Sequence, residues 1–300
     1  MATKIYPTLI FLILLISCTN SEKYNTLGEN NIKGQVKSIV ETDFSINLNN
    51  SKTIRSISET NYNKLGYIIS LKFSDNNPKF NGDFVKTFSY DDDNNIAGLK
   101  FVGVNEDIAL HESLQPFDDV YKYDYDSKGR IVKKTILSRD SMNDEKPETN
   151  TEQNERNLIF DSSKRIHYNE YKYDNRGNLV EDVFHIGSVR MNKTVFMYDD
   201  NGKKIGEVYF NSQDQLITKT LYRRDNSNRI VLEKYIYPDT LYNQTIKYKY
   251  NNYSDVIEEL RGKDLHSYIY EYDKSQNWVS KSEFLNKRQV SNIIRTIVYY

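Results

Sequence analysis

The chain has 300 residues, with 41 basic and 42 acidic side chains and a formal net charge of -1. This balance provides no overall field that would attract nucleic acid, so nucleic-acid binding is not expected. The sequence contains 25 tyrosines and 13 phenylalanines but only 4 methionines and 1 tryptophan. Because aromatic residues favour the half-buried surface of a sheet, the composition predicts an all-β protein.

The first element is an apolar run, LIFLILLI, at residues 9–16. It is shorter than the roughly 18–20 residues that span a bilayer and is typical of the core of a signal peptide. The run ends in Leu-Ile-Ser-Cys at residues 15–18, and Cys18 is the only cysteine. This ending resembles a bacterial lipobox, which implies that residues 1–17 are a signal peptide and that the Cys18 sulfur is lipidated. The alternative is an ordinary signal peptide that happens to carry a cysteine, and a catalytic thiol is less expected beside a targeting segment.

The lipobox resemblance implies an exported lipoprotein that acyl chains, palmitate among them, hold at a membrane surface. Thr19 stands where many lipoproteins retained at the inner membrane carry aspartate, which favours the outer membrane. Residues 18–31 are then the acylated cysteine and a polar tether. Residues 32–300 are predicted to form one β-hairpin repeat domain.

A short template recurs along this domain: an aromatic residue, turn-forming residues, a glycine four places on, and an apolar pair. The four clearest copies begin at Tyr62, Tyr125, Tyr173 and Tyr198, with glycines Gly66, Gly129, Gly177 and Gly202. Looser copies begin at Tyr90, Phe160, Phe210, Arg224, Tyr250 and Tyr272. Each copy predicts a hairpin turn between two strands.

The glycine of each copy is expected to need a positive φ, which other residues adopt at a steric cost. Three looser copies place residues that tolerate this region there, namely Asn94, Asp214 and Asn228. The remaining copies place Lys164, Ser254 and Gln276, which fit poorly. We expect the turns at these last three positions to differ.

The strands entering the turns alternate, as in Tyr121-Lys122-Tyr123-Asp124-Tyr125. This alternation places the tyrosines on one face, and neighbouring hairpins would align their rings into a ladder. We expect the ladder to be structural, because exposing each ring would forfeit roughly 1.5–3 kcal/mol of burial. The alternative is a ridge of aromatic faces that recognises a glycan.

The Tyr-Asp-x-x-Gly copies at 125, 173 and 198 resemble the YD (Rhs-type) repeats of bacterial surface and secreted proteins. The end of the chain is also similar to the close of small uncharacterised lipoproteins built from such repeats. In large Rhs proteins the repeats form a shell around a C-terminal toxin, whereas this chain is expected to be too short for a closed shell and to have no cargo domain after its last strand-like segment. The prediction is an elongated, curved and open antiparallel array that ends on the strand at 291–300.

Polar insertions interrupt the repeats near 75–83, 103–119 and 139–157. The histidines match no metal-binding spacing, and they are His111, His167, His185 and His266. The run Asp91-Asp92-Asp93 lacks the glycine and glutamate of a calcium loop, since Ile96 and Val102 hold those places. No catalytic, cofactor-binding or metal-binding residue is therefore predicted, and no cofactor.

These features predict a non-enzymatic cell-envelope lipoprotein that acts as a binding or scaffold module for an envelope protein or glycan. One alternative is an envelope enzyme that acts on glycans from a site in an insertion loop. Another is an assembly component with a dedicated protein partner.

Overall fold

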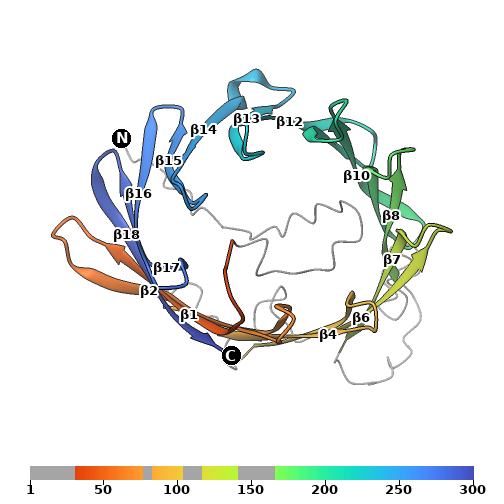
Figure 1. Ribbon diagram of the computed structural model, residues 1–300. Coiled ribbons are helices and arrows are strands. Elements are labelled where there is room, and N and C mark those ends of the chain that lie inside the picture. The colour runs from red at the N-terminus through yellow and green to blue at the C-terminus, as the bar shows by residue number, and fades with distance from the viewer. Residues whose placement is uncertain (1–30, 77–82, 104–116, 141–165) are drawn as a thin grey trace, which may run out of the picture.

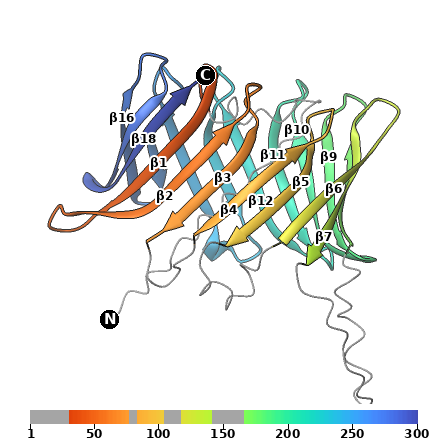
Figure 2. The ribbon, with the colours of Figure 1, turned by 90° about the horizontal axis from the view of Figure 1, so that it is seen from below.

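The computed structural model describes residues 31–76, 83–103, 117–140 and 166–300, and Figures 1 and 2 show its ribbon. These residues form an 18-stranded sheet in which every recorded pairing is antiparallel. Its first nine strands are β1 (Val36–Ile46), β2 (Lys52–Tyr62), β3 (Ile68–Asp75), β4 (Phe84–Tyr90), β5 (Ile96–Gly103), β6 (Phe117–Tyr125), β7 (Ile131–Asp140), β8 (Ile166–Tyr173) and β9 (Leu179–Ile186). The other nine are β10 (Val189–Tyr198), β11 (Lys204–Asn211), β12 (Leu216–Arg224), β13 (Ile230–Ile236), β14 (Gln244–Tyr250), β15 (Val256–Arg261), β16 (Asp264–Tyr272), β17 (Trp278–Leu285) and β18 (Arg288–Tyr299).

A short 3-10 helix, η5 (Thr240–Tyr242), lies between β13 and β14. In the described part of the chain, no helix has both the length and the apolar character that crossing a membrane requires.

The sheet closes on itself into a barrel, so the expectation of an open array was wrong (Figure 1). Strands that follow one another in the chain pair with one another, and β1 pairs with β18 as well as with β2. The comparison with the longer Rhs shells led to the expectation that this chain is too short to close. An antiparallel meander can close into a barrel with as few as about eight strands. Closure also removes both sheet edges, whose unpaired N–H and C=O groups would otherwise be open to another chain.

The last strand is not the end of an array, because β18 pairs with β17 on one side and β1 on the other. The seam runs from Val36 opposite Tyr299 to Ser45 opposite Ser291. Tyr300 extends it, since its N–H donates to the carbonyl of Gln35 over 2.9 Å. The two ends of the described chain therefore complete the barrel together.

The barrel has two different rims (Figure 2). At one rim, eight tight turns follow Tyr62, Tyr90, Tyr125, Tyr173, Tyr198, Arg224, Tyr250 and Tyr272. The remaining connections leave from the opposite rim, because alternate connections of an antiparallel meander emerge at the same end. Most of each predicted polar insertion lies outside the described residues, namely 77–82, 104–116 and 141–165, and so does the copy at Phe160 and Lys164. Residues 117–119, expected to belong to an insertion, instead begin β6.

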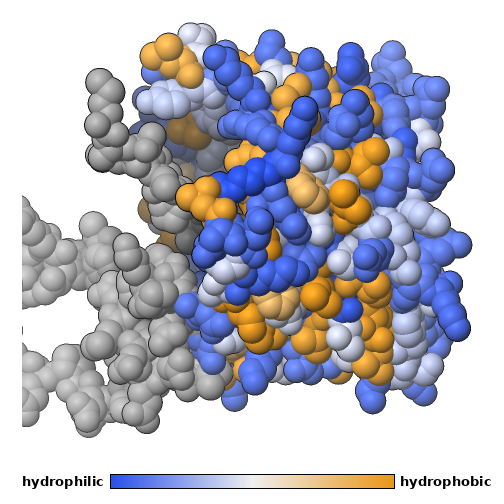
Figure 3. All heavy atoms as spheres, turned by 90° about the vertical axis from the view of Figure 1, so that its left-hand side faces the viewer, coloured by the Kyte–Doolittle hydropathy of each residue, from blue (hydrophilic) through white to orange (hydrophobic). Residues whose placement is uncertain are grey.

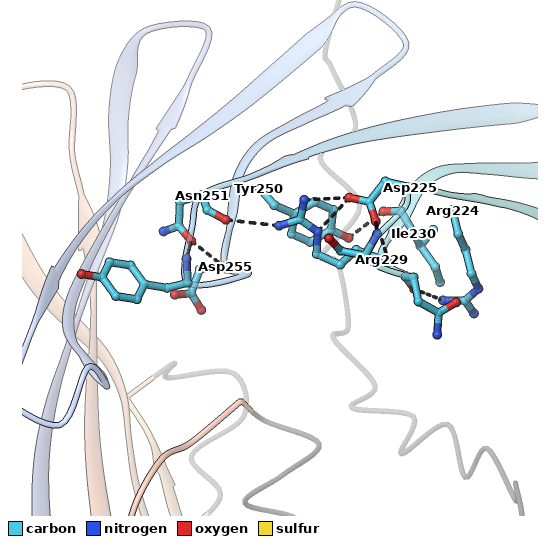
Figure 4. A network of polar contacts seen from close by, with 10 residues as sticks. Arg224, Asp225, Arg229, Ile230, Tyr250, Asn251 and Asp255 are labelled. Atoms are coloured by element: carbon cyan, nitrogen blue, oxygen red, sulfur yellow. Dashed lines mark hydrogen bonds and ion pairs between the residues drawn. The ribbon is translucent and has the colours of Figure 1, made fainter.

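The tight turns are held by the Asp or Asn that follows the aromatic residue. In one of them, Asp126 Oδ1 accepts hydrogen bonds from the N–H groups of Lys128 over 2.8 Å and of Arg130 over 3.0 Å. This is the Asx-turn chemistry that makes Asp and Asn frequent turn residues. Neighbouring turns also contact each other, as Figure 4 shows, where Arg229 Nη1 donates to the carbonyl of Asn251 over 3.2 Å.

The fourth residue after each aromatic has a positive φ. At Gly66, Gly129, Gly177 and Gly202 the angle is 87°, 74°, 90° and 76°. At Asn94, Asp214 and Asn228 it is 62°, 59° and 65°. The expectation that the turns at Ser254 and Gln276 differ was wrong, because φ is 69° and 64° there. The Asx hydrogen bonds that Asn251 Oδ1 and Asp273 Oδ1 accept from backbone N–H groups help to offset the roughly 1–2 kcal/mol that a left-handed non-glycine residue costs.

The pairing register assigns side chains to the inner or the outer face of the barrel, because residues directly opposite each other share a face. The segment before β1 lies inside the ring in Figure 1. Its Ile32 packs with Val36, Ile39 and Tyr62 in the main buried cluster. The face that carries Ile39 and Tyr62 is therefore the inner one. The register can be followed from strand to strand around the barrel. It places the repeat tyrosines on this inner face, together with one glutamate each from β11, β13, β15 and β17.

Candidate functional site: the inner wall of the barrel

Tyrosines near the turn rim join each hairpin to the next one. A β-bulge interrupts the pairing just before every tight turn, for example between Asp124 and Tyr125. In the next hairpin, Tyr173 Oη donates to the carbonyl of Ile131, just beyond that turn, over 2.8 Å. The same bond joins Tyr90 to Ile68, Tyr123 to Ile96, Tyr198 to Leu179, Tyr250 to Ile230 and Tyr270 to Val256.

This rim set of hydroxyl-to-carbonyl bonds has a structural role, since each is worth about 0.5–1.5 kcal/mol net and recurs around the barrel. Where the aromatic is replaced by Arg224, its Nε donates to the carbonyl of Lys204 over 3.3 Å instead. Figure 4 shows the bond from Tyr250 to the carbonyl of Ile230 and the neighbouring Arg224.

The six repeat aromatics chosen from the sequence do not all act alike. Tyr173, Tyr198 and Tyr250 make the hydroxyl-to-carbonyl bond just described. Tyr125 Oη instead accepts from Asn95 Nδ2 over 2.8 Å, and Tyr272 Oη donates to Asp255 Oδ2 over 2.7 Å. Tyr62 is only 4% exposed and belongs to the buried cluster.

A second tier of polar residues lies further from this rim, at the middle of the inner wall. We call it the carboxylate belt, and it consists of Glu207, Glu233, Glu259 and Glu283 from β11, β13, β15 and β17. The register places Tyr222 opposite Glu233, Tyr248 opposite Glu259 and Tyr268 opposite Glu283. Glutamates and tyrosines therefore alternate along the belt.

Hydrogen bonds connect the belt from strand to strand. Tyr248 Oη donates to Glu233 Oε2 over 3.1 Å, and Tyr268 Oη donates to Glu259 Oε2 over 3.3 Å. Tyr235 Oη donates to the same Glu233 oxygen over 2.7 Å. None of these glutamates was among the residues predicted from the sequence to form a site. A signal was present, since Glu207, Glu233 and Glu259 each stand three places after the first residue of their strand.

The tyrosines of the belt stay protonated at physiological pH. Burial, and after it the neighbouring carboxylates, raises the pKa of Tyr222, Tyr248 and Tyr268 well above the usual value of 10.0. On β6, burial and then Asp119 raise the pKa of Tyr121 to about 12. These hydroxyls are therefore neutral hydrogen-bond donors to the carboxylates of the belt.

Most belt carboxylates have a cationic partner from the same wall. Lys204 Nζ lies 2.7 Å from Glu207 Oε2 and also stands over the Phe196 ring, 4.4 Å from its centre. Arg261 forms an ion pair with Glu259. His266 Nδ1 lies 2.8 Å from Glu283 Oε1, a contact that becomes an ion pair when the imidazole is protonated.

The wall opposite the belt is apolar and aromatic. In an 18-stranded ring, β3, β4 and β5 lie nine positions away from β12, β13 and β14. The rings of Phe73 and Phe84 stack with their centres 5.2 Å apart, and Phe84 and Phe101 lie 5.3 Å apart. Lys86 Nζ stands 5.3 Å from the centre of the Phe84 ring, and burial lowers the pKa of this lysine.

The other predicted features do not converge on a site. Cys18 and His111 lie outside the described residues. His167 and His185 are on neighbouring strands but opposite faces, and His266 is on β16. Asp91 stabilises the tight turn after Tyr90, because its Oδ1 accepts a hydrogen bond from the N–H of Asn95 over 2.8 Å. Among the described residues, no group of three or more His, Cys, Asp and Glu side chains could hold a metal ion.

No family model and no curated protein matches the sequence. Among solved structures, the chain is similar to a porin-like protein from Bacteroides uniformis, with 10% identity and a TM-score of 0.44 over 89% of this chain and 99% of that one. It is also similar to a Photorhabdus luminescens Tc holotoxin pore, with 12% identity and a TM-score of 0.27 over 81% of this chain and 16% of that one. A third is an outer membrane lipoprotein-sorting protein domain from Vibrio parahaemolyticus, with 12% identity and a TM-score of 0.22 over 93% of both chains. These scores are too low to assign a family or a function.

Proposed function

We propose that the chain is a non-enzymatic cell-envelope lipoprotein that binds an envelope glycan on the inner wall of its barrel. Within this proposal, the hairpins are YD-type repeats and Cys18 anchors the protein to the outer membrane. The observation that carries the binding role is the composition of the inner wall. It combines aromatic faces with hydroxyl donors and carboxylate acceptors, which together match the apolar faces and the hydroxyl groups of sugar rings.

The width of the barrel supports access to this wall. Barrels of 16–18 strands leave an open interior, whereas barrels of about eight strands are filled by side chains. In agreement, the belt residues Tyr222, Glu233, Tyr248 and Tyr268 are partly exposed rather than buried. A ligand can therefore reach rings that also hold structural hydrogen bonds.

The outer face of the barrel favours attachment to the membrane through the lipid anchor over insertion of the barrel wall into the bilayer. Exposed lysines stand on the outer face of five strands, namely Lys72, Lys100, Lys122, Lys234 and Lys247. A lysine facing lipid near the middle of a bilayer costs about 2–4 kcal/mol. Figure 3 shows hydrophobic side chains interspersed with hydrophilic ones on the side that carries β16, β18 and β2. Ile57, Ile269 and Ile294 are among the exposed apolar residues of these strands.

The pairing of the belt carboxylates supports a binding role. Lys204 and Arg261 hold Glu207 and Glu259 in ion pairs, and these contacts fix the carboxylate oxygens as hydrogen-bond acceptors on the inner wall.

The test is calorimetric titration of the purified protein with soluble envelope glycan fragments. Tyr248→Ala removes a ring from the inner wall, and Tyr168→Ala removes one from the outer face, where Tyr168 stacks on His185 with centres 4.5 Å apart. We expect the first change to abolish glycan binding and the second to leave it intact. Equal binding by both variants, with thermal melting showing both folded, would reject the inner wall as the site. Release of shorter products from the fragments would reject the non-enzymatic part of the proposal.

A further inference from the structure

Two consecutive repeats of the belt share one arrangement but differ in one side chain. Glu259 faces Tyr248 across the sheet, accepts from Tyr268 and is paired with Arg261 two places on. Glu233 likewise faces Tyr222 across the sheet and accepts from Tyr248.

Two places after Glu233 stands Tyr235, in the position that the arginine occupies in the next repeat. Its hydroxyl donates to Glu233 Oε2 over 2.7 Å. The Glu233 repeat therefore keeps the carboxylate and the rings, but it has a tyrosine where the next repeat has the arginine that pairs with its glutamate.

Other inner-wall glutamates also pair with a cationic side chain, which comes from a different position in each case. Lys204 pairs with Glu207 while standing over an aromatic ring. Beyond the belt, Arg295 Nε lies 2.6 Å from Glu41 Oε1, and its guanidinium stands 3.3 Å from the centre of the Trp278 ring. A cation held between a carboxylate and an aromatic face is thus a recurring feature of this wall.

Glu233, Tyr222, Tyr235 and Tyr248 together form what we call the Glu233 cage. No ion pair to Glu233 occurs within the part of the chain that the structure describes. Both tyrosine hydroxyls bond to Oε2, so Oε1 remains as an acceptor. Burial and the nearby carboxylates keep the three tyrosines neutral. Lys204 Nζ stands 5.8 Å from the centre of the Tyr222 ring, but its ion pair is with Glu207.

We propose that the Glu233 cage binds the ammonium group of a ligand, which would pair with Glu233 as Lys204 and Arg261 pair with Glu207 and Glu259. Rings arranged around a cation stabilise it through their negative faces, and a carboxylate adds an opposite charge. One carboxylate with neutral hydroxyls supplies too few hard oxygen ligands for calcium, which takes six to eight. The inference rests on the open inner wall of the proposed function and narrows its ligand to one that bears an ammonium group.

The ammonium group has two chemical sources, a quaternary headgroup and an amino sugar. The probes are therefore choline and a short glucosamine oligosaccharide, each titrated calorimetrically into the purified protein. We expect at least one of them to bind at a single site. Glu233→Gln should weaken that binding by about tenfold or more, since it removes the charge opposite to that of the ammonium group and keeps the shape of the side chain. Glu170→Gln, at an exposed residue of the outer face, is the matched control and should change nothing.

Two exchanges between the repeats sharpen the test. Tyr235→Arg supplies an internal guanidinium as Arg261 does to Glu259, so it should abolish binding without lowering the melting temperature. Arg261→Tyr should create a second cage and raise the stoichiometry from one to two. Binding that survives Tyr235→Arg, or that falls equally in Glu170→Gln, would overturn the inference.

The fully N-acetylated oligosaccharide separates this inference from the proposed function. If the acetylated glycan binds through Tyr248 while the ammonium probes show no dependence on Glu233, the proposed function stands and the inference falls. If the ammonium probes bind through Glu233 and no glycan binds, the inference stands and the glycan-binding function falls.

Discussion

Closure of the barrel at the β1–β18 seam can be tested with a pair of cysteines. Thr42 and Ile294 lie directly opposite each other across the seam, on the outer face. In an antiparallel sheet such residues have Cα atoms about 4.5–5.5 Å apart, which is within the range that a disulfide bridges. Thr42→Cys with Ile294→Cys should therefore oxidise to a disulfide in the folded protein.

The size of the effect follows from the loop that the disulfide closes. The two positions are 252 residues apart, from 294 minus 42. On the chain-entropy model a loop of this length stabilises the folded state by about 5 kcal/mol, less any strain in the bond. The oxidised protein should therefore unfold at a clearly higher denaturant concentration than its reduced form.

The assay is made in a Cys18→Ser background, so that the introduced thiols are the only ones. Linked peptides are identified by mass spectrometry, and unfolding is followed with and without reductant. Thr42→Cys with Ile57→Cys is the positive control, because β1 and β2 pair in an open array as well as in a barrel. Thr42→Cys with Glu271→Cys is the negative control, because β17 and β18 separate β16 from β1. A disulfide at 42–57 but none at 42–294 would refute the closed barrel.

Three further predictions concern the anchor, the rim tyrosines and alkaline stability. Cys18→Ala should abolish incorporation of radiolabelled palmitate in cells, and labelling that persists would contradict lipidation. Tyr173→Ala should destabilise the protein by at least about 2 kcal/mol in denaturant titration, as large-to-small core changes do, whereas Tyr173→Phe should cost only about 1 kcal/mol for its bond to Ile131. If Tyr173→Phe lowers the free energy of unfolding no more than the outer-face change Tyr168→Phe does, the hydroxyl-to-carbonyl bonds of the rim do not stabilise the barrel. The raised pKa of Tyr121, about 12 against 10.0, contributes stability that is complete below pH 10 and is lost as the pH rises through 12. Melting temperatures measured from pH 8 to pH 12 should therefore fall across this window, and Tyr121→Phe should make the fall less steep.

The sequence by itself determined the local structure of this protein. Alternation in the segment at 121–125 assigned its tyrosines to one face, and the Asp or Asn after each aromatic specified a tight turn. These features depend on contacts within four or five residues, so they can be read along the chain. The turns at Ser254 and Gln276 were predicted wrongly, because the prediction used the φ preference of one residue. The hydrogen bonds of the whole turn hold both residues at a positive φ.

Only the tertiary structure decided which residues meet across the barrel. The belt contact between Tyr248 and Glu233 depends on the register of β13 with β14. The seam joins residues near 40 to residues near 296, and no local pattern distinguishes this pairing from an exposed edge at each end. The number of strands and their common twist and tilt decide whether the two edges meet, and these are properties of the complete sheet. The inner wall, and with it every proposal about a ligand, exists only because the edges meet.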